Sequence, residues 1–191
     1  MAAQVAEPQI QATVAYLRAI VALVDGRFED SRTAALDAVE AWHDTAPLVL
    51  PWALRAAAYS GNLAGAHDAG RLLDEHPSTG ALARTGQLGG AAIVAALEGR
   101  TQDAVNEFRA AIELMHQMGM EFSAALLTVD ALKLLPDQDP PRQWAVDARA
   151  LFERLDATAC LALLNESLSA SIAGSSTPTA KTTSDAAVPT G

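Results

Sequence analysis

A glycine recurs three times along the chain, each time between two stretches with helical periodicity, and this repetition constrains the fold more than any single motif. The three glycines are Gly26, Gly61 and Gly99, so they are 35 and 38 residues apart. The segments that contain them span residues 24–42, 59–75 and 97–115. A fixed internal period of this length predicts helical hairpins that stack in chain order.

Small or apolar residues stand at equal distances from each glycine. Five, nine and twelve residues after the glycines lie Ser31, Ala35 and Ala38, then Ala66, Gly70 and Leu73, then Ala104, Phe108 and Ala111. Eleven, seven and four residues before them lie Ala15, Ala19 and Ala22, then Leu50, Leu54 and Ala57, then Leu88, Ala92 and Ala95. Steps of three and four residues share one helix face, so the two helices of each hairpin should pack along these stripes.

A fourth, distorted hairpin is predicted from residues 121–135 and 141–155, with Ala148, Phe152 and Leu155 on its inner face. Asp139 before a proline suits a helix N-cap, and Asn62 and Thr101 suit the same role after the earlier turns. A last apolar stripe should cover the end of the stack, through Leu161, Leu164, Leu168 and Ile172.

These patterns divide the chain into a short arm (residues 1–7), a helical repeat domain (8–173) and a tail (174–191). The tail is rich in Ser, Thr, Ala and Pro, a composition that predicts disorder.

Composition supports an all-helical chain and excludes several classes of function. The 191 residues include 42 alanines, about a fifth of the chain, and alanine is the best helix former. The net charge is −10 and the arginines and lysines are scattered singly, which argues against nucleic-acid binding by this chain. No apolar run is long enough to span a membrane, so we expect a cytoplasmic protein that does not bind membranes. Cys160 is the only cysteine, which excludes an intrachain disulfide.

The hairpins resemble the tetratricopeptide repeat, in their period, their turn glycines and above all in the series Ala104, Phe108 and Ala111 after Gly99. The large aromatic residue near the start of that family's first helix and its closing proline are mostly absent. The resemblance implies an all-α fold: a tetratricopeptide-like right-handed solenoid of about four helical hairpins plus a C-terminal capping helix.

Residues 96–119 and 131–164 resemble the C-terminal end of large actinobacterial signalling proteins, with the run 148–157 ("ARALFERLDA") as the closest phrase. Those proteins join an ATPase module and a helical-repeat region to an adenylate or guanylate cyclase domain or to a LuxR-type DNA-binding domain. The sequence lacks a Walker motif, recognisable cyclase aspartates and a C-terminal helix-turn-helix. The resemblance therefore implies a sensor arm without catalysis of its own.

Metal and catalytic sites are weakly indicated. Glu40/His43 and Glu113/His116 are two Glu-x-x-His pairs, as in di-iron bundles, but the helices expected at residues 11–24 and 49–59 supply no glutamate to complete such a site. His67 and His76 have no acidic or thiol partner at ligand spacing. We therefore expect no metal, no cofactor and no enzyme activity.

What remains is recognition of a protein, a peptide or a neighbouring domain. In a solenoid the first helices of the hairpins line the concave side. They present Arg18, Trp52, Arg55 and Tyr59, which we name as the candidate partner-binding face; alternatively, both aromatic residues belong to the core and both arginines are solvated. The apolar N-terminal helix could also form a homodimer. The other hypotheses are an enzymatic or non-enzymatic helical bundle that binds a small molecule or metal, and a fragment of a larger ATPase- or cyclase-type regulator.

Overall fold

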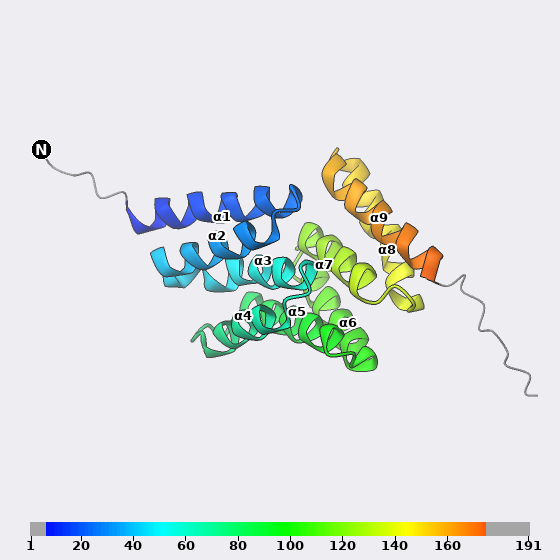
Figure 1. Cartoon of the computed structure of the whole chain (residues 1–191), viewed down its shortest axis with the longest axis horizontal. Helices are drawn as coiled ribbons and strands as arrows, with labels where there is room; N and C mark the ends of the chain where they lie inside the picture. The colour runs from blue at the N-terminus through cyan, green and yellow to red at the C-terminus, as the bar shows by residue number, and fades with distance from the viewer. Residues whose placement is uncertain (1–6, 175–191) are drawn as a thin grey trace, which may run out of the picture.

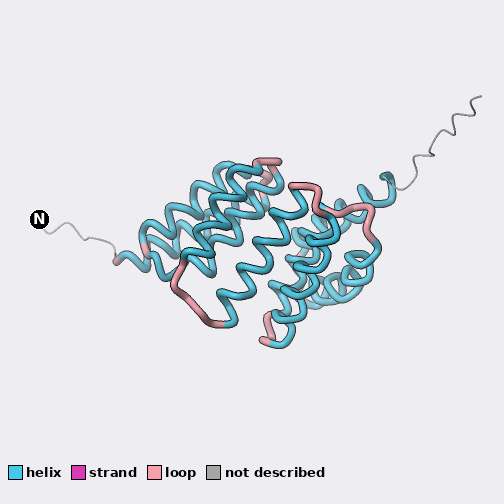
Figure 2. The backbone as a smooth tube through the Cα atoms, turned by 90° about the horizontal axis from the view of Figure 1, so that it is seen from below, coloured by secondary structure: helices cyan, strands magenta, loops and turns pink. Residues whose placement is uncertain are grey.

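The computed structural model describes residues 7–174, and every element within that range is a helix (Figures 1 and 2). The α-helices are α1 (Pro8–Val24), α2 (Phe28–Ala41), α3 (Ala46–Tyr59), α4 (Leu63–Glu75), α5 (Ala81–Leu97), α6 (Thr101–Gln117), α7 (Glu121–Leu134), α8 (Asp139–Arg154) and α9 (Thr158–Gly174), and a short 3-10 helix, η1 (His43–Thr45), precedes α3. The all-α class is confirmed. Nearly all of the predicted arm and tail lies outside the described residues.

Consecutive helices pair along the chain, and the pairs stack beside one another (Figure 1). Within the pairs, α1 packs on α2, α3 on α4, α5 on α6 and α7 on α8. The odd-numbered helices also contact each other in order, α1 with α3, α3 with α5, α5 with α7 and α7 with α9. The odd-numbered helices therefore form one continuous row.

The predicted stripes pack almost as the periodicity requires. In the first three hairpins all but two of the stripe residues are buried, the exceptions being Ala15 and Gly70, which are half-buried. Phe108 and Phe152 are fully buried, whereas Leu155 is 52% exposed. Its placement on the inner face was wrong, because α8 ends at Arg154 and Leu155 already belongs to the turn.

Glycine closes the first helix of each of the first three hairpins for a conformational reason. Gly26, Gly61 and Gly99 have φ angles of 74°, 68° and 76°, a region that residues with a Cβ rarely adopt. The next backbone N–H reaches back to the last helical turn, as from Arg27 to the Ala22 carbonyl at 2.8 Å. This is the Schellman ending of a helix.

The position directly after each turn glycine is the N-cap of the following helix. Asn62 occupies it before α4 and accepts a hydrogen bond from the Gly65 amide at 2.8 Å, as predicted. Before α6 the same position is Arg100, so Thr101 is the first helical residue and its N-cap assignment was wrong. The assignment of Asp139 was also one residue late, because α8 begins at Asp139 and Gln138 precedes it.

Two clusters of buried side chains form the core, and α7 belongs to both. Ala124, Leu127 and Ala131 face the larger cluster, built from α1 to α7. Val129 and Leu132 face a second cluster shared with α8 and α9, which includes Phe152 and Leu164. The packing of α9 against α7 and α8 agrees with a capping role for Leu161, Leu164 and Leu168, while the Ile172 side chain lies outside the described residues. Because α7 is covered on two sides, a polar side chain on either of these buried faces must find partners within the protein.

Candidate functional site

An apolar pocket of about 240 Å³ opens on the row of odd-numbered helices. Each of these helices contributes to its lining, α1 through Tyr16 and Ile20, α3 through Trp52 and Arg55, α5 through Ile93, α7 through Phe122 and Leu127, and α9 through Cys160 and Leu163. A pocket of this size is just below the range of roughly 300–1,000 Å³ that is usual for small-molecule sites.

Three glycines of α5 line the pocket and let neighbouring helices pack closely against this helix. Gly86, Gly89 and Gly90 all line it, in the middle of a helix where glycine costs about 1 kcal/mol relative to alanine. A Cβ atom at Gly90 would lie 3.0 Å from the Leu54 side chain, and one at Gly89 would lie 3.4 Å from Leu127. Small residues on this face of α5 thus allow close approach of α3 and α7.

A buried ion pair joins α3 to α7 beside the pocket. The Nε of Arg55 donates to Oδ2 of Asp130 at 2.6 Å, and the Tyr59 hydroxyl donates to Oδ1 at 2.6 Å. Asp130 is fully buried and Arg55 is 6% exposed. The Arg55 guanidinium also lies over the Trp52 ring, 5.2 Å from its centroid.

The surroundings of this pair carry excess positive charge. The Nζ of Lys133 lies 4.3 Å from the Tyr59 ring centroid, so two cations accompany one carboxylate. Burial raises the pKa of Asp130, and the charge of Arg55 and the hydrogen bonds from Tyr59 and Arg55 oppose that shift. Burial and the nearby Asp130 carboxylate raise the pKa of Tyr59 well above its usual value. Tyr59 therefore stays a neutral hydrogen-bond donor.

The four residues predicted as one partner-binding face separate into two places. Trp52 and Arg55 line the pocket, and Tyr59 lies behind them as a partner of Asp130. Arg18 does not join them, because it is exposed on α1 and faces a separate hollow between α1 and α2. Arg55 is also not the solvated arginine that the alternative interpretation proposed, since its charge is paired within the protein.

Sequence reasoning missed Asp130 and did not place Cys160 in a pocket. A signal for Asp130 was available, because it is the one acidic residue in the apolar run 122–135, where a charge must be paired if the helix is buried. Cys160 is half-buried, packs against the second core cluster and lies in the pocket wall. Burial raises the pKa of its thiol, and the charge of Arg55 counteracts this.

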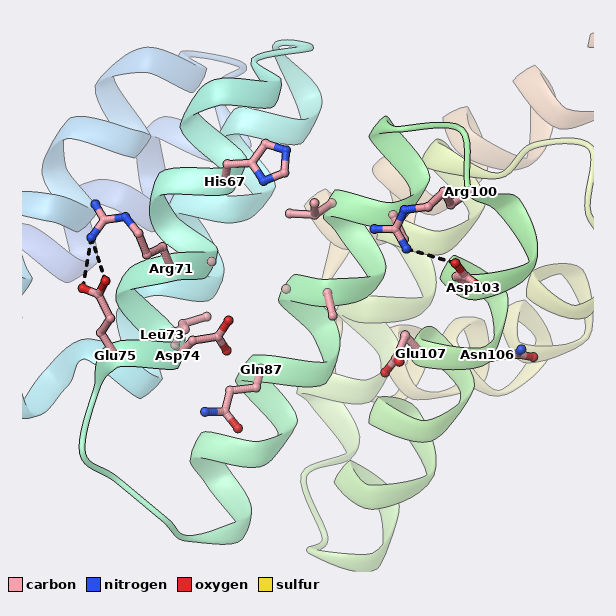
Figure 3. A pocket seen from close by; sticks show the side chains of 15 residues that line it. His67, Arg71, Leu73, Asp74, Glu75, Gln87, Arg100, Asp103, Asn106 and Glu107 are labelled. Atoms are coloured by element: carbon pink, nitrogen blue, oxygen red, sulfur yellow. Dashed lines mark hydrogen bonds and ion pairs between the residues drawn. The ribbon is translucent and has the colours of Figure 1, made fainter.

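A second, larger hollow of about 550 Å³ lies between α4, α5 and α6, and it is lined by charged groups (Figure 3). Its two arginines are already engaged, Arg71 with Glu75 on α4 and Arg100 with Asp103 on α6. The first pair lies within α4 and the second joins the N-cap of α6 to its first turn; both measure 3.0 Å and are largely exposed. Such pairs contribute little and leave no cation free for a ligand.

Potential metal ligands converge at one point among the described residues, where His43, Asp44 and His76 lie together. His76 uses both ring nitrogens within the protein: Nδ1 accepts from the Ser78 amide at 3.2 Å, so Nε2 carries the proton that it donates to the His43 carbonyl at 3.2 Å. Its ring also stacks on that of His43 at 4.7 Å. His76 thus offers no lone pair to a metal.

The two Glu-x-x-His pairs do not meet in the described part of the chain. His116 bonds to Glu121 at 2.7 Å instead. This arrangement does not support a di-metal centre.

No protein-family model, curated protein or solved structure gives a significant match to this chain. Within residues 7–174, no helix is long and apolar enough to cross a membrane.

Proposed function

We propose that this chain is a tetratricopeptide-like repeat domain that acts as a non-catalytic protein-interaction module, the sensor or partner-binding arm of a bacterial signalling or transcriptional regulatory system. The observation that carries the proposal is an exposed apolar stripe along α1. It consists of five residues that are each between 42% and 56% exposed: Ile10, Val14, Leu17, Val21 and Val24.

The stripe has the spacing of a helix-packing seam. Its members follow one another at steps of four, three, four and three residues, which is the a/d pattern of a coiled coil. Arg18 is the one charged residue of α1, so the helix can meet another apolar helix without burying a carboxylate. Contiguous exposed apolar surface of this kind marks interaction sites in folded proteins. The partner that the stripe fits is an amphipathic helix, and a second copy of α1 meets that requirement.

The repeat architecture of the proposal is supported by the stacked hairpins and their shared turn geometry. Gly26, Gly61 and Gly99 end equivalent helices in the same left-handed conformation. Repeat domains built in this way offer long surfaces for recognition, and their function resides in contacts with partners.

Photo-crosslinking from the stripe tests the interaction. A photoreactive amino acid would replace Leu17 in the stripe or, as a matched control, Val146, an exposed apolar residue of α8. We expect protein adducts from position 17 that exceed those from position 146, and a Val21→Glu substitution should abolish them. Equal crosslinking from both positions would refute the proposed interaction module. Light scattering on the purified chain then distinguishes a second copy from a different protein.

A second candidate function is a small-molecule-binding helical domain, and the apolar pocket is the observation in its favour.

A further inference from the structure

The pocket on the odd-numbered helices contains an unusual combination of groups for an acidic protein. Its 24 lining residues include one that is charged, Arg55, and no lining carboxylate comes from the described residues. The chain as a whole carries 23 acidic residues against 13 basic ones. The charge next to this apolar space is thus opposite in sign to the charge of the protein.

Some guanidinium N–H groups of Arg55 remain available to a ligand in the pocket. Its side chain makes one hydrogen bond, from Nε to Asp130, and no bond from its Nη nitrogens is found within residues 7–174. No buried side-chain nitrogen or oxygen in that range lacks a partner, so the Nη nitrogens reach accessible space, and Arg55 lines the pocket. Guanidinium N–H groups match the oxygens of a carboxylate.

The balance of charge also favours an anion. Asp130 neutralises one of the two nearby cations, Arg55 and Lys133, so the cluster keeps an excess positive charge. Lys133 itself lies over the Tyr59 ring rather than in the pocket wall. A second carboxylate would balance both cations, and none of the residues that line the pocket provides one.

We propose that this pocket binds a small apolar monocarboxylic acid, with the alkyl or aryl body among the apolar side chains and the carboxylate at the Nη nitrogens of Arg55. The volume of 240 Å³ limits the size of the ligand. At about 30 Å³ for one methylene-sized group, it holds a chain of about eight carbons, and the two carboxylate oxygens lie against Arg55 at the wall. The pocket shares Val24 with the α1 stripe, but the two proposals are tested through different residues, so either can fail alone.

Cys160 provides a direct readout, because it lies in the pocket wall and is the only cysteine in the chain. The probe is octanoate, with 1-octanol as the uncharged analogue and butyrate as a short acid. The rate of Cys160 alkylation by N-ethylmaleimide would be followed by mass spectrometry at about pH 8.5, because the thiolate fraction, though reduced by burial, is larger there than at neutral pH. We expect saturable protection by octanoate, with 1-octanol binding on the order of tenfold more weakly, as for loss of a charged hydrogen bond.

Two variants separate this site from adventitious binding. Ser123→Leu narrows the pocket at a half-buried position and should abolish protection, whereas Ser169→Leu, on the exposed side of α9, should not change it. The double variant Arg55→Leu/Asp130→Leu removes both charges together and should eliminate the preference for octanoate over octanol. Circular dichroism melts confirm that each variant folds.

Three results would overturn the proposal. They are the absence of protection by octanoate, equal protection by octanol, and protection that survives Ser123→Leu. Crosslinking from the α1 stripe is not affected by any of them, so failure of the ligand site is distinguishable from failure of the interaction module.

Discussion

Replacing Asp130 with leucine should destabilise the protein more than a change of one surface charge could. Asp130 is fully buried and accepts hydrogen bonds from Arg55 and Tyr59, both at 2.6 Å. The substitution leaves the Arg55 charge in a site that is 6% exposed, without its carboxylate. Removing one partner of a buried pair costs about 3–5 kcal/mol, a large part of the roughly 5–15 kcal/mol that stabilises a typical domain.

The assay is urea unfolding followed by far-ultraviolet circular dichroism, with the slope m checked for each variant. For m of about 2 kcal/mol per molar urea, a loss of 3–5 kcal/mol lowers the midpoint by about 2 M. Arg55→Leu should lower the free energy of unfolding by a similar amount, because it leaves the buried Asp130 carboxylate without its cation.

The double variant Arg55→Leu/Asp130→Leu decides whether this reasoning is correct. If the cost of each single change is an unpaired buried charge, removing both charges should recover most of the stability, because apolar pairs often replace buried ion pairs without loss. The reasoning is refuted if Asp130→Leu costs less than about 1 kcal/mol. It is equally refuted if the losses of the two single variants simply add in the double variant, since residues in direct contact should be coupled.

Three further predictions concern a helix, a hydroxyl and a cap. Gly70→Ala should stabilise the protein by up to about 1 kcal/mol, since the new Cβ would lie 3.9 Å from its nearest neighbour, the Val94 side chain. Gly90→Ala should stabilise it less or destabilise it, because its Cβ would lie 3.0 Å from the Leu54 side chain. Thermal melts of the two variants test this difference. Tyr59→Phe should make the free energy of unfolding less sensitive to alkaline pH. Because the pKa of Tyr59 is raised in the folded state, the hydroxyl keeps its proton there while the unfolded chain releases it, and the wild type loses stability as pH rises above about 10. Urea unfolding of both proteins at about pH 9 and about pH 10.5 would measure the difference. Asn62→Ala should cost about 1 kcal/mol in urea unfolding through loss of the 2.8 Å cap to the Gly65 amide, and an unchanged midpoint would contradict that role.

The hairpins could be predicted from the sequence because their causes are local. A glycine at positive φ and small residues at steps of three and four specify where a helix ends and which face packs. Phe108 and Ala111 are buried as their spacing requires. The predictions for Thr101 and Leu155 are each wrong by one residue at a helix end, where the capping geometry and not the side-chain periodicity sets the boundary.

The candidate site could be predicted only in part, because it depends on contacts between distant residues. Trp52 and Arg55 were identified by residue type on a first helix, but the partner of Arg55 is 75 positions away. Periodicity assigns faces within one helix and does not say which charge on α7 meets α3. Arg18 illustrates the same limit: it belongs to a first helix of a hairpin, yet it faces a hollow against α2 instead of the pocket.

The glycines of α5 connect the sequence to the pocket most directly. A helix with larger side chains at 86, 89 and 90 would fill the space between α3 and α7, and the helix itself would gain stability, since glycine in a helix interior is unfavourable by about 1 kcal/mol at each position. Two of these positions are crowded by leucine side chains within 3.4 Å, which explains why even alanine fits poorly at Gly90. Close packing alone, however, does not explain a cavity of 240 Å³ beside the buried Arg55, whose Nη groups make no hydrogen bond to the described residues. The glycines accommodate the approach of α3 and α7 that brings Arg55 to Asp130, and the space that remains next to Arg55 is where a ligand can bind.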